Sequence, residues 1–201
     1  MNRDIDDLVS EIISQLSSLA HIRPGDIPNI DLYMDQVTSF MDEHLKSSRR
    51  FESDKILTKT MINNYAKNKL LPPPEKKRYS KEHMLVLIFI YYMKGILALD
   101  DIKAILEPVT GRFFKSDAEL NIEDIYSEVY ALGKEHIEEI KKEIRAAYQT
   151  ASEAFPEAAE GDREFLRLFS FICLLCFDIY LRKQIIEKLI DSWNDSKPKK
   201  S

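Results

Sequence analysis

Three consecutive prolines, Pro72 to Pro74, decide where helices can run in the middle of this chain. Proline lacks the backbone N–H that a helix needs and pushes the preceding residue out of the helical region. A helix that starts after Thr58, a suitable N-cap, must therefore stop near Leu70. Beyond the prolines, Ser80 suits the cap of a new helix, and the almost wholly apolar run Met84 to Tyr92 predicts that this helix is buried.

The remaining segments also follow the helical period. Leu97 to Leu106 predicts a short helix ended by Pro108 and Gly111. Because no strand-type alternation occurs, we predict an all-α fold with at most a tiny hairpin near the prolines. The other predicted helices are Ile5 to Leu19, Leu32 to Leu45 with Asp31 as its cap, Ile122 to Tyr148, and Arg163 to Trp193.

The chain of 201 residues, 44% of them hydrophobic, suits one compact domain or two small ones. We predict a helical domain over residues 1–110, with its core at 31–107, and a C-terminal helical region over 111–193 for dimerisation or effector binding. The tail, residues 194–201, has no apolar residue to bury and is predicted to be disordered.

Positive charge is concentrated around the prolines. The net charge is −5, yet Arg49 to Lys81 holds ten basic and three acidic residues, a local charge of +7 that leaves −12 for the rest. Such segregation indicates one part that meets an anion and another that repels it. We expect the prolines to form an extended spacer that presents Lys76, Lys77 and Arg78 to a phosphate backbone.

A polar face on the helix after Thr58 predicts contact with DNA. Residues at i, i+3, i+4 and i+7 share one helix face, and asparagine, threonine and lysine suit base edges in the major groove. A merely solvated face has the same pattern, so both interpretations stay open. The predicted DNA-binding residues are Thr58, Lys59, Thr60, Asn63, Asn64, Lys67, Lys69, Lys76, Lys77, Arg78 and Lys81.

The segment Lys59 to Leu106 resembles the DNA-binding end of the MerR family. In that family's winged helix-turn-helix, a tyrosine-containing turn and Leu-Leu-Pro end the recognition helix, and Tyr-Ser opens the helix after the wing. The resemblance implies a transcriptional regulator that binds double-stranded DNA, and it suggests a small-molecule effector of unknown identity. The matching residues are Tyr65, Leu70, Leu71, Pro72, Tyr79, Ser80, Leu99, Ile102 and Leu106.

The chain departs from the MerR pattern in two places. Asn63, Asn64 and Tyr65 stand where that family usually has an arginine and paired tyrosines. Only the four residues Glu75 to Arg78 separate Pro74 from Tyr79, too few for a two-stranded wing. The resemblance therefore implies a MerR-like helix-turn-helix with a minimal or absent wing, followed by a helical bundle.

The stretch from NIDLYMDQVTSF through YSKEH also resembles an uncharacterised bacterial family, the YkrK-like proteins. That resemblance covers most of the first 110 residues and implies no mechanism. It leaves room for an alternative function, a helical ligand-binding or protein-interaction module that keeps a degenerate helix-turn-helix without DNA binding.

Surplus apolar surface in the last two helices predicts a homodimer, because helix-turn-helix proteins generally pair to occupy two half-sites. Five aromatic residues of the last helix fit a core better than a ligand pocket. These residues are Phe165, Phe169, Phe171, Phe177 and Tyr180.

Other locations and chemistries find little support. The start MNRDIDDLV lacks a secretory pattern, which predicts a cytoplasmic protein. Arg167 and Asp178 interrupt the most apolar stretch, so we predict no membrane partner.

Cys173 and Cys176 lie in FICLLCF without a histidine nearby, and we expect them in the core rather than at a metal. The histidines are scattered, with His83 predicted to be surface or half-buried, and we predict no enzyme and no cofactor.

Overall fold

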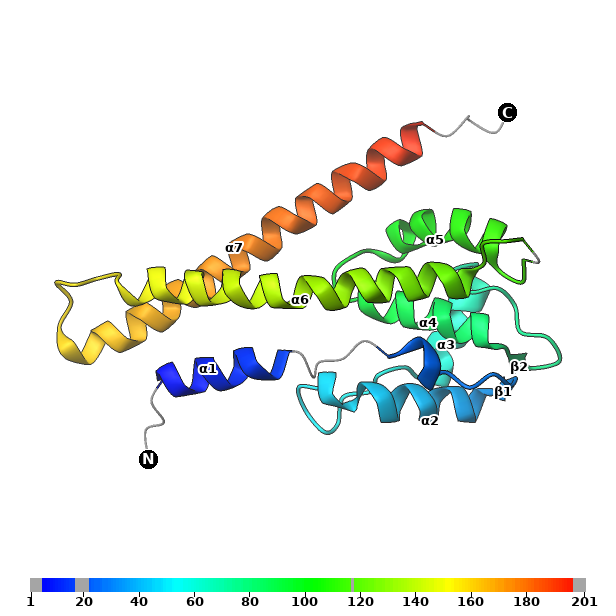
Figure 1. The fold of residues 1–201 in the computed structure, drawn as a ribbon, viewed down its shortest axis with the longest axis horizontal. Coiled ribbons are helices and arrows are strands. Elements are labelled where there is room, and N and C mark those ends of the chain that lie inside the picture. Colours follow the sequence, from blue (N-terminus) through cyan, green and yellow to red (C-terminus); the bar gives the residue numbers. More distant parts are fainter. Residues whose placement is uncertain (1–4, 17–21, 117, 197–201) are drawn as a thin grey trace. The chain divides into compact units, whose positions relative to one another are not determined.

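The computed structural model describes residues 5–16, 22–116 and 118–196. These residues form helices joined by loops, with one pair of two-residue strands (Figure 1), so the fold is predominantly helical as predicted. The chain divides into two compact units, which are described separately. Unit 1 comprises Met1–Ser18 and Gly133–Lys188, and unit 2 comprises Leu19–Leu132 and Leu189–Ser201.

The compact units group the chain differently from the domain boundary after residue 110, which stays a prediction. Unit 2 contains the predicted DNA-binding residues. Its elements are the 3₁₀-helices η2 (Pro24–Asp26) and η3 (Lys46–Ser48), the strands β1 (Leu32–Tyr33) and β2 (Arg78–Tyr79), the helices α2 (Met34–Leu45), α3 (Lys59–Lys67), α4 (Lys81–Met93) and α5 (Leu99–Phe113), the first third of α6 (Ile122–Ser152), and the end of α7 (Glu160–Asp195) from residue 189.

Helix α4 forms the centre of the unit 2 core. Its residues 83–88 and Ile90 are buried, which confirms the burial predicted from the apolar run. A helix without a polar face must be surrounded on all sides, and the start of α6 lies against α4 through the rings of Phe89 and Tyr126, 5.3 Å apart. Other buried side chains of this core are Val37, Met41, Leu45, Ile62, Tyr65, Leu70, Leu71, Ile102 and Leu106.

The start of α2 differs from the prediction. Leu32 and Tyr33 form strand β1 and pair with Tyr79 and Arg78 of the antiparallel strand β2, so Asp31 does not cap a helix. Helix α2 begins at Met34 instead, and the side chain of Gln36 accepts a hydrogen bond from the Tyr33 backbone N–H at 2.8 Å. The strand pair joins distant residues, whereas the predicted hairpin was local.

Helix α5 is longer than predicted because it continues through Pro108 and Gly111 to Phe113. A proline inside a helix costs about 3 kcal/mol. Packing compensates, since Ile102 and Leu106 are buried and Val109 and Phe113 pack against the same core beyond the proline.

Unit 1 is a small helical cluster of α1 (Ile5–Gln15), the later part of α6 and the greater part of α7 (Glu160–Asp195). Its buried core is Val9, Ile13, Ala151 and Phe171. The expectation that Cys173 and Cys176 lie in the core is wrong, because both are exposed. Phe171 alone of the five predicted core aromatics is buried; Phe165, Phe169, Phe177 and Tyr180 are exposed.

Both ends of the chain extend beyond the described residues. Helix α7 runs to Asp195, and positions 197–201 of the predicted tail, like Leu19 of the first predicted helix, lie outside the described residues. Among the helices that the structure describes, none combines the length and the apolar character needed to cross a membrane.

Candidate nucleic-acid interface

Helix α3 carries the predicted base-contacting residues and is fixed at its N-terminus by Thr58. The Thr58 hydroxyl accepts a hydrogen bond from the Met61 backbone N–H at 3.2 Å, as predicted for an N-cap. Ile62 and Tyr65 are buried on the inner face. The outward residues Thr60, Asn63, Asn64 and Lys67 are all exposed, so this polar face is open to a ligand, while its contact with DNA stays a prediction.

Replacing Thr58 by alanine will destabilise the protein by about 1 kcal/mol, because the N–H of Met61 loses its cap. Urea denaturation followed by circular dichroism measures this difference. The matched control is Thr60→Ala on the exposed face, which we expect to change stability by less than about 0.5 kcal/mol. Equal effects of the two substitutions would show that the cap is not what fixes α3.

A left-handed residue ends α3. Lys69 has φ 61°, its N–H donates to the Ala66 carbonyl at 3.2 Å, and the Leu70 N–H donates to the Tyr65 carbonyl at 2.9 Å. These two bonds form a Schellman motif, in which glycine normally takes the place of Lys69. Leu70 and Leu71 then enter the core, so the chain leaves α3 in a fixed direction.

The four residues Glu75 to Arg78 form a tight turn that presents two lysines. The Arg78 N–H donates to the Glu75 carbonyl at 2.8 Å, and Lys76 and Lys77 have φ of 48° and 64°. Positive φ at both central residues is the mark of a type I′ turn, which favours Asn-Gly. A side chain in this conformation costs about 1–2 kcal/mol per residue. We call Glu75 to Arg78 the basic turn.

Contacts on both sides hold the basic turn in place. The Arg78 guanidinium lies over the Tyr33 ring, 5.2 Å from its centroid, and donates to the Tyr33 hydroxyl at 3.1 Å. The Lys115 ammonium donates to the Glu75 carboxylate at 2.5 Å, and this hydrogen bond lowers the pKa of Glu75. The tip residues Lys76 and Lys77 are exposed. The two ends of the turn are therefore held in place, while the two ammonium groups at its tip are open to solvent.

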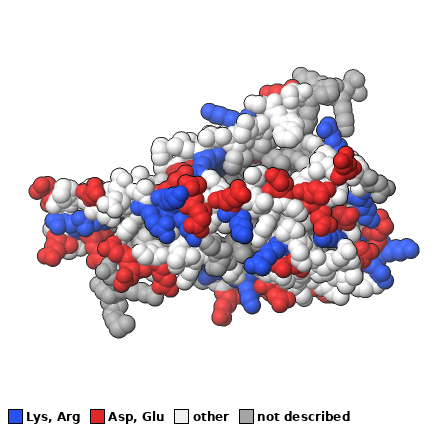
Figure 2. Space-filling view, viewed as in Figure 1, with Lys and Arg blue, Asp and Glu red and all other residues white. Residues whose placement is uncertain are grey.

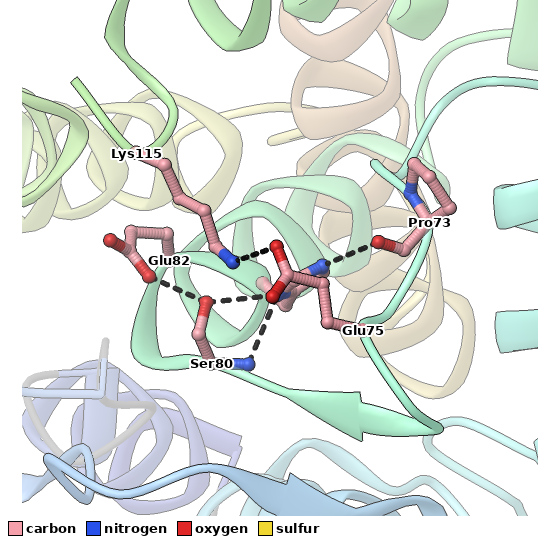
Figure 3. A network of polar contacts seen from close by, with 6 residues as sticks. Pro73, Glu75, Ser80, Glu82 and Lys115 are labelled. Atoms are coloured by element: carbon pink, nitrogen blue, oxygen red, sulfur yellow. Dashed lines mark hydrogen bonds and ion pairs between the residues drawn. The ribbon is translucent and has the colours of Figure 1, made fainter.

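His83 joins Pro73 and Ser80, which lie on either side of the basic turn, by hydrogen bonds to both. Figure 3 shows Pro73, Glu75, Ser80 and Lys115 gathered in this network. The His83 Nδ1 accepts from the Ser80 backbone N–H at 3.0 Å, and its Nε2 lies 3.3 Å from the Pro73 carbonyl. Because Nδ1 accepts, the proton of the neutral ring is on Nε2, which donates to Pro73. Burial lowers the pKa of His83 and so favours this neutral form.

The prediction that His83 is surface or half-buried is wrong, because the residue is 1% exposed. The rings of Tyr79 and Phe114 pack edge-on against it, with centroids 5.6 and 4.8 Å away. His83 occupies the third position of α4, where a side chain can reach back to the N-cap residue. The spacing of three residues between Ser80 and His83 is the sequence feature that could have predicted this contact.

The predicted DNA-binding lysines divide into ion-paired and unpaired groups. Lys59 pairs with Asp35 and Lys81 with Glu123, so acidic residues partly neutralise those two charges. For Lys67, Lys69, Lys76 and Lys77 no ion pair is found within the described residues. Figure 2 shows Lys and Arg side chains around β1 and β2, with Asp and Glu side chains among them. The candidate interface is therefore a set of free lysines within a mixed surface.

Other kinds of site are less developed in unit 2. The described residues contain no group of three or more histidine, cysteine or carboxylate residues that could hold a metal ion.

An apolar cavity of about 320 Å³ lies between α4, α5 and the start of α6. The residues that line it include Phe89, Tyr92, Met93, Ile105, Val109 and Tyr126.

Sequence reasoning missed three supports of the basic turn: Tyr33, Lys115 and His83. Tyr33 and Lys115 lie 45 and 37 residues from Arg78 in the chain, and no local pattern links them to it. Their roles follow from strand pairing and from the ion pair with Glu75.

A protein-family model described as a domain of unknown function, DUF1836, matches residues 22–129, more than half of the chain. The matched range includes every predicted DNA-binding residue. No curated protein and no solved structure matches the chain. The match agrees with the prediction of an uncharacterised family, while the MerR and YkrK-like resemblances stay predictions.

Proposed function

We propose that the protein, which belongs to the DUF1836 family, binds double-stranded DNA and regulates transcription. The family description assigns no function, so the proposal is argued from the site itself. In this proposal α3 is the base-reading helix of a MerR-like helix-turn-helix, and the basic turn takes the place of the wing. Thr60, Asn63, Asn64 and Lys67 face the bases. Lys69, Lys76, Lys77 and Arg78 contact phosphates.

One observation carries the proposal: lysines occupy both positive-φ positions of the basic turn. Glycine or asparagine would form this turn at lower cost, so the backbone alone does not account for lysine there. Strained residues held by their surroundings tend to lie at functional sites. A rigid loop with two exposed ammonium groups loses little entropy when it meets a phosphate backbone.

Retention of sheared genomic DNA on the purified protein, at several salt concentrations and followed by sequencing, tests the proposal. We expect specific fragments to survive at physiological salt, with affinity that falls steeply as salt rises. If no DNA is retained even at low salt, the proposal is wrong.

Replacing both Asn63 and Asn64 by alanine will relax sequence preference more than it weakens binding to arbitrary DNA. Asparagine contacts base edges, and each good base contact contributes about 1–3 kcal/mol of discrimination. The expected result is a loss of on the order of tenfold or more on retained fragments, with little change on random DNA of equal length. Competition binding with both DNAs measures it. An equal loss on both would assign these residues to phosphate contacts.

The proposal includes a homodimer, since one helix and one short turn contact only a few base pairs. Two copies on one DNA would gain affinity because the second contact becomes intramolecular.

The apolar cavity favours a second candidate function, binding of a small apolar effector. Its volume of about 320 Å³ lies within the range of ligand sites in proteins. Thermal-shift measurements with aromatic small molecules of matching size test this candidate, and the absence of any shift would remove its support.

A further inference from the structure

Helix α7 presents a continuous apolar stripe that has no cover in the described structure of unit 1. Phe165, Phe169, Ile172, Cys176 and Ile179 follow one another in steps of four and three residues. This is the spacing at which helices pair side by side. All five are exposed. We call these five residues the α7 stripe.

The α7 stripe lies on a different face of the helix from the residues that pack within unit 1. Phe171 is buried in the unit 1 core, and Leu175 packs against the same cluster. Arg182 fixes the later part of the helix by donating to Glu143 of α6 at 2.6 Å. The inner face of α7 therefore makes the contacts within unit 1, and the α7 stripe takes no part in those contacts.

The α7 stripe and its neighbour Tyr180 form an apolar patch on one face of the helix. Their five large apolar side chains, Phe165, Phe169, Ile172, Ile179 and Tyr180, are 50–66% exposed. At roughly 100 Å² each they present about 500 Å². The largest apolar patch on a typical monomer is about 300–600 Å² and is often functional. Four further exposed apolar side chains, Leu174, Phe177, Leu181 and Ile185, lie on other faces of α7.

A groove beside the stripe offers space for side chains of a partner. It has a volume of about 650 Å³, lies between α6 and α7 within unit 1, and shares Ile179 with the α7 stripe. Ile140, Ile144 and Leu174 line it, and Arg182 with its carboxylate partners closes one edge. An apolar ridge next to an apolar groove on one surface is the arrangement that a two-fold symmetric interface needs.

We infer that the α7 stripe binds the α7 stripe of a second copy of this chain, with the two helices antiparallel. The direction follows from Lys183, which is the next residue in the same spacing after Ile179. Lys183 pairs with Glu187 of its own helix at 3.6 Å. Parallel helices in register would still place the Lys183 ammonium against its own copy, which is unfavourable for like charges. Antiparallel helices instead place it near Phe165 and Glu164 of the partner, and they also oppose the two helix dipoles. This inference rests on the homodimer in the proposed function and is independent of DNA binding.

Analytical ultracentrifugation of the wild type and of the double variant Phe169→Glu/Ile172→Glu tests the inference. We expect the wild type to be a dimer at micromolar concentration and the variant to be a monomer, with a dissociation constant raised at least 100-fold. Both side chains are about half exposed, so the variant should keep its fold, which circular dichroism checks. The matched control is Ile30→Glu/Phe51→Glu, which introduces the same charges at exposed apolar residues of unit 2 and should remain dimeric.

Cross-linking gives a second measurement of the same contact. Cys173 and Cys176 are exposed one turn apart on the same helix, so a Cys173→Ser background is used to prevent a bridge within one chain. In that background a short bis-maleimide should join two chains through Cys176, and it should not join chains that also carry Phe169→Glu/Ile172→Glu. In a background with Cys173→Ser and Cys176→Ser, Phe165→Cys alone should fail to cross-link. Phe165→Cys together with Lys183→Cys should cross-link if the helices are antiparallel.

Several outcomes would overturn the inference. A wild-type monomer up to ~100 µM would do so, because standard interfaces associate far below that concentration. A variant that stays dimeric would place the interface elsewhere, and cross-linking of Phe165→Cys alone would make the helices parallel. DNA retention by wild type and variant is measured in parallel, so that failure of the DNA proposal and failure of this interface are distinguished.

Discussion

Replacing Lys76 by asparagine and Lys77 by glycine will weaken DNA binding on the order of 10²- to 10³-fold at physiological salt while it makes the protein more stable. Each phosphate contact contributes a slope of about −0.9 to the dependence of log affinity on log salt. Two lysines from each copy of a homodimer supply four contacts, so the slope should decrease by about 3 to 4. Fluorescence anisotropy with a retained fragment at several salt concentrations measures both quantities.

The opposite sign of the stability change is what makes this variant informative. Lys76 and Lys77 have positive φ, and Asn-Gly is the preferred pair for such a turn. Relief of that strain should raise the free energy of unfolding by about 1–2 kcal/mol in total. A loss of DNA affinity therefore cannot be attributed to a damaged fold. Urea denaturation of both proteins gives the comparison.

The control for lost charge is Lys134→Gln/Lys188→Gln, which removes two exposed positive charges from α6 and α7. We expect this control to keep its affinity and salt slope. If the Lys76→Asn/Lys77→Gly variant also keeps both, the lysines of the basic turn only keep it soluble and the DNA proposal loses its central observation. Charge reversal, Lys76→Glu/Lys77→Glu, should abolish binding altogether if the turn contacts phosphates.

Local signals predicted the elements of unit 2 that depend on neighbouring residues. Thr58 caps α3 and Ser80 precedes α4 because a hydroxyl before an apolar helix satisfies free N–H groups whatever the rest of the fold does. The burial of α4 followed from a run too apolar to expose. The helical period also predicted that α3 has a buried apolar face and an exposed polar face, because that period depends only on neighbouring residues.

Features that depend on distant residues were not predictable from the sequence. The pairing of β1 with β2 joins Tyr33 to Arg78, and the ion pair of Glu75 with Lys115 spans 40 residues. Pro108 ended a helix in the prediction, but packing of Val109 and Phe113 carries α5 past it. In each case contacts within the folded unit outweighed a local preference.

The exposure of α7 shows a further limit of periodicity. FICLLCF predicts a helix with little polar surface, so we expect its cysteines in a core, while the surplus apolar surface of the last two helices predicts a homodimer. Periodicity alone does not say which face meets which neighbour. Unit 1 covers only the side that includes Phe171 and Leu175. Cys173 and Cys176 lie outside that contact and are exposed. The number of neighbours around a helix is a property of the assembly, not of its own sequence.

Lowering the pH from about 6.5 towards 5 will destabilise the protein through His83. Burial lowers the pKa of His83 below the value of about 6.5 that is usual for histidine, so the unfolded chain binds this proton at a higher pH than the folded chain does. The stabilising contribution of neutral His83 is therefore complete above pH 6.5 and decreases as pH falls towards the folded pKa. Protonation of Nδ1 also replaces an acceptor with a donor facing the Ser80 N–H.

Charged neighbours of His83 modify this effect without reversing it. Lys115 lowers the pKa of His83 further, whereas the negative charges of Glu82 and Asp31 and the hydrogen bond to the Pro73 carbonyl raise it. Desolvation is the largest contribution, so the direction of the shift is set by burial. Because His83 holds Pro73 and Ser80 together, acid should loosen the basic turn before it unfolds the rest of unit 2.

Two substitutions of His83 separate its titration from its hydrogen bonds. His83→Gln keeps an acceptor for the Ser80 N–H, as in an ordinary capping box, so its free energy of unfolding should stay nearly constant between pH 6.5 and 5 while that of the wild type falls. His83→Ala removes the ring and both hydrogen bonds, and it should cost about 2–4 kcal/mol at pH 6.5 and less as the pH falls towards 5, because the wild type then loses the contribution of neutral His83. Urea denaturation at several pH values gives the three profiles. If the wild type and His83→Gln show the same slope, the proton is taken up elsewhere, and the buried imidazole supports the turn by packing alone.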